Sequence, residues 1–192
     1  MPVLTIYPYP LARVAGTAPF ARAVIGEGIS AAGAAGIGSV CLGILVLGLR
    51  ELRRPAEGRA CLLAVLVGLT ITAYSVVDKL GVGRVSPVVY LAGLAAVTGV
   101  VLAPVVLLCY PQECKETWRE HKRTSLGVGL GSYLLILAAF RQAPAGYVVA
   151  ARELSIAVAV GLGVAVLKEP LTMPKVLSTA AILTGVVLVK VA

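Results

Sequence analysis

VSPVVYLAGLAAVTGVVLAPVVLLCY, residues 85–110, decides the fold, because it carries no charged side chain from end to end. A helix needs roughly 20 apolar residues, within about 17–25, to cross the hydrocarbon core of a bilayer. Ser30–Leu49, Ala60–Val77 and Thr124–Phe140 are uncharged as well. So many stretches cannot all be buried in a small soluble protein, since too little polar surface would remain to cover them. The sequence therefore predicts an all-α integral membrane protein.

Composition and charge agree with a membrane protein. Of the 192 residues, 59% are hydrophobic and only 14% are charged, and the mean hydropathy is +0.96. The net charge of +8 comes mostly from loops between the apolar stretches, where cytoplasmic lysine and arginine gather in membrane proteins. Because the sequence contains no groove-reading motif, we expect no nucleic-acid binding. No basic segment precedes the first apolar residues, so we also expect no cleavable signal peptide.

Six spans are expected, together with a seventh helix that would span poorly. The six are Ser30–Leu49, Ala60–Val77, Val88–Cys109, Ser125–Phe140, Gly146–Leu167 and Val176–Ala192. The seventh is Leu11–Ile25, where Pro19 should kink or end the helix because proline lacks a backbone donor. The predicted architecture thus has six to seven transmembrane helices.

The distribution of basic residues predicts an orientation. If Arg50–Arg59 is cytoplasmic, then Pro111–Arg123 and Lys168–Lys175 lie on the same side, which holds ten basic residues against four on the other. The positive-inside rule then places the C-terminus outside.

Two pairs of short segments indicate an internal repeat. Glu27–Ser30 resembles Glu169–Thr172, and Gly43–Val46 resembles Gly185–Leu188. Both pairs have the same offset, because 169 − 27 and 185 − 43 each equal 142. The alternative is chance similarity between apolar helices. Transporters built from repeats hold their substrate near mid-membrane at the repeat interface.

Several motifs resemble those of a known family. Ala151–Ser155 (ARELS), Leu167–Leu171 (LKEPL) and Leu183–Val187 (LTGVV) are similar to the closing helix pair of an EamA-type domain, the repeat of the drug/metabolite transporter superfamily. The opening of the same domain is similar to Tyr74–Gly81 followed by Ser86–Tyr90. The end of a preceding domain is similar to Tyr9–Arg13 followed by Gly16–Pro19 and Glu27. The resemblance implies two inverted five-helix repeats. Residues 1–50 would then be the last two helices of a partial first repeat, and residues 60–192 a complete second repeat.

The resemblance also implies a function and partners. It implies a multi-pass cell-membrane transporter, a permease or exporter, that moves small metabolites or drug-like compounds by alternating access within the lipid bilayer. Because the first three helices of the family's plan are missing, a homo- or hetero-oligomer would complete it. The alternative is a truncated, non-transporting membrane protein or partner subunit. The family's usual cytoplasmic C-terminus conflicts with the charge count.

We expect neither an enzyme nor a cofactor. The sequence contains no nucleophile triad and no phosphate-binding loop. The four cysteines and His121 do not have the spacing of metal ligands. No catalytic residue and no metal ligand is therefore predicted.

The candidate substrate-binding residues centre on Arg152 and Glu153, since ionisable groups inside a span are costly and usually functional. Neighbouring helical residues point about 100° apart, so each of the two needs a partner on another helix or a water-filled cavity. We expect Arg152 to contact an anionic or polar substrate group, with Ser155 on the same face, and Glu153 to couple to charge or a proton. A structural polar network is the alternative.

Three further residues are weaker candidates. Tyr147 and Tyr74 could line a substrate path, although tyrosine is also common at membrane interfaces. Asp78 is either a substrate ligand or a charge at the solvated end of the span Ala60–Val77.

Overall fold

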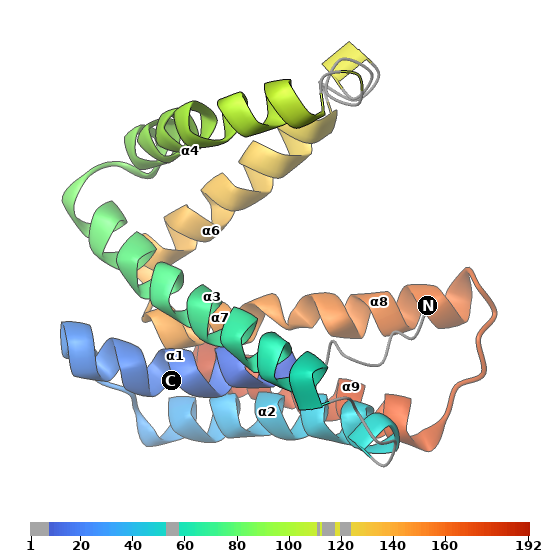
Figure 1. The fold of residues 1–192 in the computed structure, drawn as a ribbon. Helices are drawn as coiled ribbons and strands as arrows, with labels where there is room; N and C mark the ends of the chain where they lie inside the picture. The colour runs from blue at the N-terminus through green and yellow to red at the C-terminus, as the bar shows by residue number, and fades with distance from the viewer. Residues whose placement is uncertain (1–7, 53–57, 111, 113–117, 120–123) are drawn as a thin grey trace. The chain divides into compact units, whose positions relative to one another are not determined.

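A computed structural model describes residues 8–52, 58–110, 112, 118–119 and 124–192, and all regular structure in these ranges is helical (Figure 1). The elements are α1 (Pro8–Ile25), α2 (Ala31–Leu52), α3 (Gly58–Arg84), α4 (Pro87–Cys109), the π-helical η2 (Ser125–Leu130), α6 (Gly131–Gln142), α7 (Ala145–Arg152), α8 (Leu154–Ala165) and α9 (Met173–Val191). The predicted all-α fold is confirmed. The loop residues 53–57, His121 and Cys114 lie outside the described residues, as do most of the residues behind the charge count for Pro111–Arg123.

The apolar helices match the six predicted spans. Within the described ranges, four segments are long and apolar enough to cross a membrane: Leu62–Arg84, Pro87–Cys109, Ala145–Ala165 and Met173–Val191. Two shorter apolar helices, Ala31–Leu47 and Leu126–Gln142, correspond to the remaining two spans. The chain is therefore a multi-pass helical membrane protein.

Helix α1 differs in part from the expectation. It begins at Pro8 and continues through Pro19 to Ile25, so this proline does not end it. The helix stops where Gly26 adopts a φ of +76°, a left-handed conformation that glycine adopts without steric cost, and donates its N–H to Arg22 O at 3.0 Å.

The chain divides into two compact units, which are described separately. The first unit comprises Met1–Val77 and Ala143–Ala192, and the second comprises Asp78–Gln142, so α3 contributes to both. The predicted repeats, residues 1–50 and 60–192, were defined by sequence similarity. The compact units do not test them, so this division stays a prediction.

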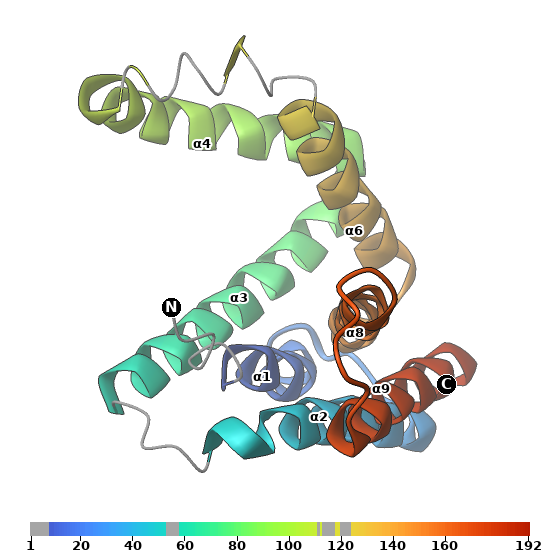
Figure 2. The ribbon, with the colours of Figure 1, turned by 90° about the vertical axis from the view of Figure 1, so that its right-hand side faces the viewer.

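In the first unit, α2 and α9 lie side by side although they are far apart in the sequence (Figures 1 and 2). Glycines make this approach possible, as small residues do between helices in lipid. A Cβ added to Gly43 would lie 2.8 Å from Ser178 O, and one added to Gly185 would lie 2.6 Å from Gly36 O. Under an offset of 142 residues, Gly43 corresponds to Gly185 and Gly36 to Ser178. The two close contacts are therefore equivalent.

Neighbouring contacts follow the same relation. A Cβ on Gly43 would also meet Ile182 N at 3.2 Å, and a Cβ on Gly185 would meet Val40 N at 2.9 Å, where 40 and 182 again differ by 142. Ser39 Oγ donates to Ala181 O at 2.8 Å, and these two residues are themselves 142 apart. The offset found in the sequence therefore also relates the two faces of the α2–α9 contact.

Helix α1 packs against α2, α7 and the first part of α3. Gly68 of α3 lies so close to α1 that an added Cβ would be 2.7 Å from Tyr9 O. Thr17 Oγ1 donates to Arg13 O at 2.7 Å and lies 3.3 Å from Thr72 Oγ1, within hydrogen-bond distance. These contacts hold α1 beside the cavity described below.

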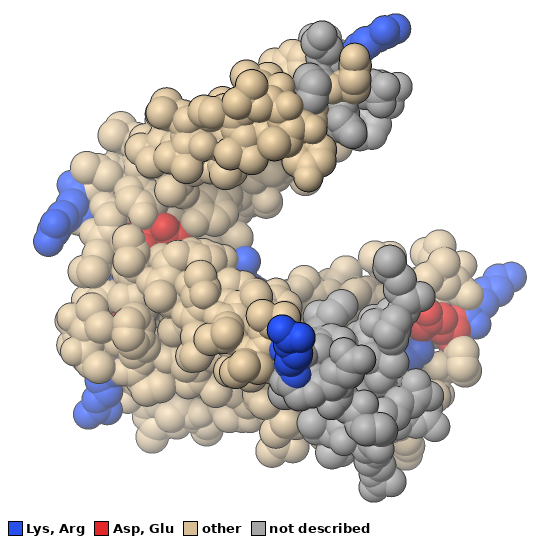
Figure 3. Space-filling model, in the orientation of Figure 1, with Lys and Arg blue, Asp and Glu red and all other residues tan. Residues whose placement is uncertain are grey.

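The second unit contains the end of α3, α4, η2 and α6. Ser86 accepts a hydrogen bond from Val89 N at 3.4 Å, and Pro87 occupies the first turn of α4, so both residues favour a helix start here. None of the residues of α4 is buried in the structure, which suits a helix that faces lipid. On the face in Figure 3 the charged side chains form small, separate groups on a mostly uncharged surface.

Asp78 is the first residue of the second unit, and the alternative that it marks a solvated helix end is wrong. Helix α3 continues past it to Arg84, and Asp78 is buried, with 3% of its surface exposed. Its carboxylate accepts hydrogen bonds from Tyr90 OH at 2.9 Å and Tyr133 OH at 2.5 Å. Two phenol donors from α4 and α6 thus replace the water that a helix end would have supplied.

Candidate functional site

A cavity of about 940 Å³ lies within the first unit, which is within the range of small-molecule sites. Residues from α1, α2, α7, α8, α9 and the segment between α8 and α9 line it. Most of these residues are apolar. The charged ones are Arg13, Arg152, Glu153, Glu169 and Lys175.

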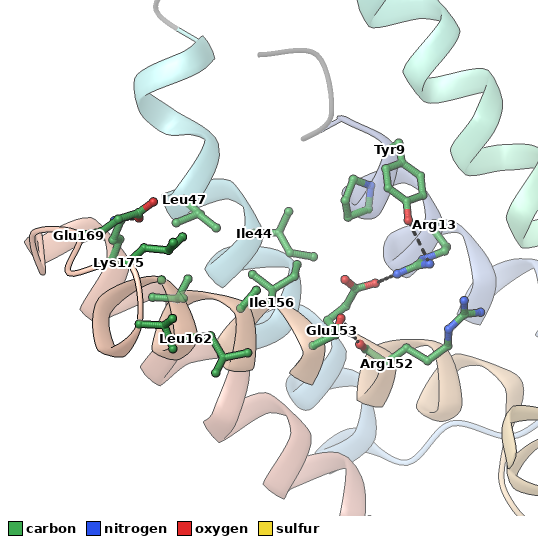
Figure 4. Close-up of a pocket in the computed structure, with 17 residues that line it drawn as sticks. Tyr9, Arg13, Ile44, Leu47, Arg152, Glu153, Ile156, Leu162, Glu169 and Lys175 are labelled. Carbon is green, nitrogen blue, oxygen red and sulfur yellow. Dashed lines mark hydrogen bonds and ion pairs between the residues drawn. The ribbon is translucent and has the colours of Figure 1, made fainter. Parts of the chain in front are cut away.

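A buried ion pair occupies one end of the cavity (Figure 4). Arg13 Nη2 of α1 donates to Glu153 Oε1, and the side chains of Arg13 and Glu153 are only 7% and 2% exposed. Tyr9 lies one helical turn before Arg13, with its ring centroid 5.3 Å from the guanidinium and its hydroxyl 3.4 Å from Nη1. Arg13 therefore has an anionic, a polar and an aromatic neighbour.

Glu153 lies well inside the apolar segment Ala145–Ala165, where α7 ends and α8 begins. A charge at such a position is expensive unless it is paired and hydrogen-bonded. As expected from the sequence, Glu153 finds its partner on another helix and not in its neighbour Arg152.

Arg152 lines the same end of the cavity but makes no ion pair with any described residue. Its Nη1 is buried without a hydrogen-bond partner in the described part of the chain, and so is Arg13 Nε. In Figure 4 the Arg152 side chain extends away from Leu162, so its guanidinium lies on the same side as Arg13. This end of the cavity thus has more hydrogen-bond donors than acceptors.

The other end of the cavity carries a second, more exposed ion pair. Lys175 Nζ lies 2.7 Å from Glu169 Oε2, and these side chains are 24% and 50% exposed. Apolar residues such as Ile44, Ile156 and Leu162 lie between the two pairs (Figure 4). The cavity is therefore apolar in the middle and charged at both ends.

Three of the six predicted site residues lie together. Arg152, Glu153 and Ser155 all line the cavity, and Ser155 Oγ donates to Arg152 O at 2.9 Å. Their contact with a substrate stays a prediction.

The other three predicted residues do not line this cavity. The Tyr147 hydroxyl lies 3.1 Å from Ser30 N and 3.2 Å from Ser30 Oγ. Tyr74 is half-buried in α3 and is not among the lining residues. Asp78 belongs to the second unit. Their role as substrate ligands also stays a prediction.

The predicted site residues did not include Arg13, Tyr9 or the Glu169–Lys175 pair. Arg13 and Tyr9 were named only as part of a motif that resembles the family. The helix Leu11–Ile25 was expected to span the membrane poorly, so Arg13 was not considered a buried charge. A signal was present: Arg13 lies in an otherwise apolar stretch and, like Glu153, needs a partner of opposite charge.

No metal centre is visible in the described residues, where no group of three or more His, Cys, Asp or Glu is close enough to bind an ion.

In a comparison with protein families, residues 58–191 match the EamA-like transporter family. This match covers more than two thirds of the chain. No curated protein and no solved structure matches the chain.

Proposed function

Because the chain belongs to the EamA-like transporter family, we propose that it is a permease that carries a small organic solute across the cell membrane by alternating access. The cavity in the first unit would hold the solute. The observation that carries the proposal is the buried Arg13–Glu153 pair in its wall, because charged groups inside apolar segments mark solute and ion paths.

The position of the cavity supports this proposal. Its lining comes from α1 and α2 near one end of the chain and from α7 to α9 near the other. The pair joins two of these segments, since Arg13 belongs to α1 and Glu153 to the α7–α8 junction. A change in how these segments pack would therefore alter the charges that a bound solute meets.

Uptake into proteoliposomes tests the proposal. The full chain is reconstituted, and a labelled panel of amino acids, nucleosides, organic acids and amphiphilic cations is screened against protein-free liposomes. We expect saturable uptake of at least one solute, and we expect Glu153→Gln to reduce it more than Lys190→Gln does, because Lys190 is exposed at the end of α9 and outside the cavity.

The opposite result favours the alternative. If the reconstituted chain is helical by circular dichroism but accumulates no solute above the protein-free background, it does not transport alone. Co-reconstitution with candidate partner chains would then test a partner-subunit role. The homo- or hetero-oligomer predicted from the resemblance is part of the same proposal. The mass of the protein in nanodiscs gives the number of chains that associate.

A further inference from the structure

Among the described residues, the charges that line the cavity do not balance. Arg13 and Glu153 neutralise each other at one end, and Lys175 and Glu169 do so at the other. Arg152 is left with one positive charge and no ion pair with a described residue. An unpaired guanidinium in a mostly apolar wall is unfavourable, so an anion that enters the cavity gains from pairing with it.

The hydrogen bonds lead to the same conclusion. Each guanidinium carries five N–H donors and no acceptor. The acceptors that Arg13 and Arg152 find at this end are one carboxylate and one tyrosine hydroxyl, both on Arg13. Arg13 Nε and Arg152 Nη1 remain buried without a partner among the described residues. A ligand that brings oxygen acceptors would satisfy donors that the described residues leave unpaired.

The middle of the cavity determines the rest of the ligand. Ile44, Ile156 and Leu162 separate the two charged ends, and no charged side chain that the structure describes lies among them (Figure 4). A fully hydrophilic anion would lose hydration there without compensation, whereas an apolar body would gain from burial.

We propose that this cavity binds an amphiphilic organic anion, whose acid group pairs with Arg152 beside Arg13 and whose apolar body lies along Ile44, Ile156 and Leu162. This ligand class rests on the proposed function, because it names the solute of the same site. Arg152 lines the cavity, and its Nη1 atom is buried without a hydrogen-bond partner among the described residues, so it has a donor to offer an acid group.

A binding assay with three matched probes tests the ligand class. Tritiated phenylbutyrate is bound to the full chain in phosphatidylcholine nanodiscs, and unlabelled phenylbutyrate, phenylbutyramide and phenylbutylamine compete for the site. The three share one apolar body and differ only in the head group. We expect the acid to compete at least roughly tenfold better than the amide, and the amine to compete worst. Equal competition by all three would overturn the proposal.

Arginine variants assign the effect to the site. Arg152→Gln should weaken phenylbutyrate binding roughly tenfold or more, and Arg152→Lys should restore part of it because the charge remains. Arg141→Gln is the matched control, since Arg141 is an exposed arginine of the second unit. Because Arg152 makes no side-chain hydrogen bond to a described residue, its removal should not unfold the chain, and the circular dichroism of each variant checks this. Unchanged binding by Arg152→Gln would overturn the proposal.

The acid can come from solution or from a lipid head group, and lipid composition separates these sources. The assay is repeated in nanodiscs containing phosphatidylglycerol at high salt, which screens the surface charge. A higher apparent Kd identifies the anionic lipid as a competing occupant, and an unchanged Kd identifies a water-soluble acid. Binding without uptake would reject the proposed function alone, whereas uptake with equal binding of acid, amide and amine would reject the ligand class alone.

Discussion

Ser39 on α2 and Ala181 on α9 are 142 residues apart and are joined by a hydrogen bond of 2.8 Å, with equivalent glycine contacts around it. The two helices therefore present matching surfaces to each other. Five predictions rest on this contact and on the polar residues of the two units.

Replacing Gly185 tests the close approach of α2 and α9. A Cβ there would lie 2.6 Å from Gly36 O, a backbone atom that cannot move without shifting the helix. We expect Gly185→Ala to lower the free energy of unfolding by about 1–3 kcal/mol. Gly38→Ala on α2 is the control, because a Cβ at Gly38 meets nothing within 4 Å, and alanine there should be neutral or stabilising by up to about 1 kcal/mol. Unfolding in mixed micelles, followed by circular dichroism, measures both; equal effects would contradict the prediction.

The Arg13–Glu153 pair should show strong coupling. Replacing either residue alone by leucine leaves the other charge buried, which costs about 3–5 kcal/mol of unfolding free energy. The double variant should be more stable than either single variant, because neither charge of the pair is then left buried without the other. Additive losses across the double-mutant cycle would disprove the coupling.

The Glu169–Lys175 pair is the natural comparison for the buried pair. These side chains are 50% and 24% exposed, so water screens their attraction. Replacing either residue by alanine should change the free energy of unfolding by about 1 kcal/mol or less. A loss as large as that of the buried pair would mean that the end of the cavity near Lys175 is closed to water.

Asp78 and its two tyrosines should stabilise the second unit. Tyr133→Phe and Tyr90→Phe each remove one hydrogen bond to the buried carboxylate, at a cost of about 1.5–3 kcal/mol. Amide hydrogen exchange in α4 and α6 should become faster in both variants. The exposed Tyr110 provides the control, and Tyr110→Phe should leave exchange unchanged. If it accelerates exchange as much, the effect is not specific to Asp78.

Tyr147 separates a structural role from a ligand role. Its hydroxyl lies within hydrogen-bond distance of Ser30 N and Oγ, so Tyr147→Phe should cost about 1 kcal/mol of stability. Because Tyr147 does not line the cavity, phenylbutyrate affinity should stay within about twofold of wild type. Tyr74→Phe, at another tyrosine outside the lining, should also leave affinity unchanged. Weaker binding by either variant would place that tyrosine in the substrate path.

The sequence predicted the apolar helices well, because crossing a bilayer imposes a length and an apolar composition that can be counted along the chain. It also identified the offset that relates Gly43 to Gly185. It placed the end of α3 wrongly, since the pair Asp78–Lys79 resembles a helix end. The tyrosines from α4 and α6 make a buried carboxylate possible there, and such distant partners leave no local pattern.

The cavity shows the same limit of sequence reasoning. Arg152, Glu153 and Ser155 were identifiable because they interrupt an apolar segment. The residue that neutralises Glu153 could not be identified from the sequence. The helical pattern shows only which residues three or four positions apart can meet on one helix. Arg13 is 140 residues away, and only the packing of α1 against α7 brings it to Glu153.

The matching faces of α2 and α9 have a consequence for assembly. Because the two faces are equivalent, the face of α2 can pack against α9 of the same molecule or against the equivalent helix of a neighbouring molecule. The covalent chain makes this choice, by holding the two helices at an effective concentration on the order of millimolar. Cutting the chain between α2 and α9, or crowding many copies into one bilayer, therefore shifts the balance toward exchange of helices between molecules.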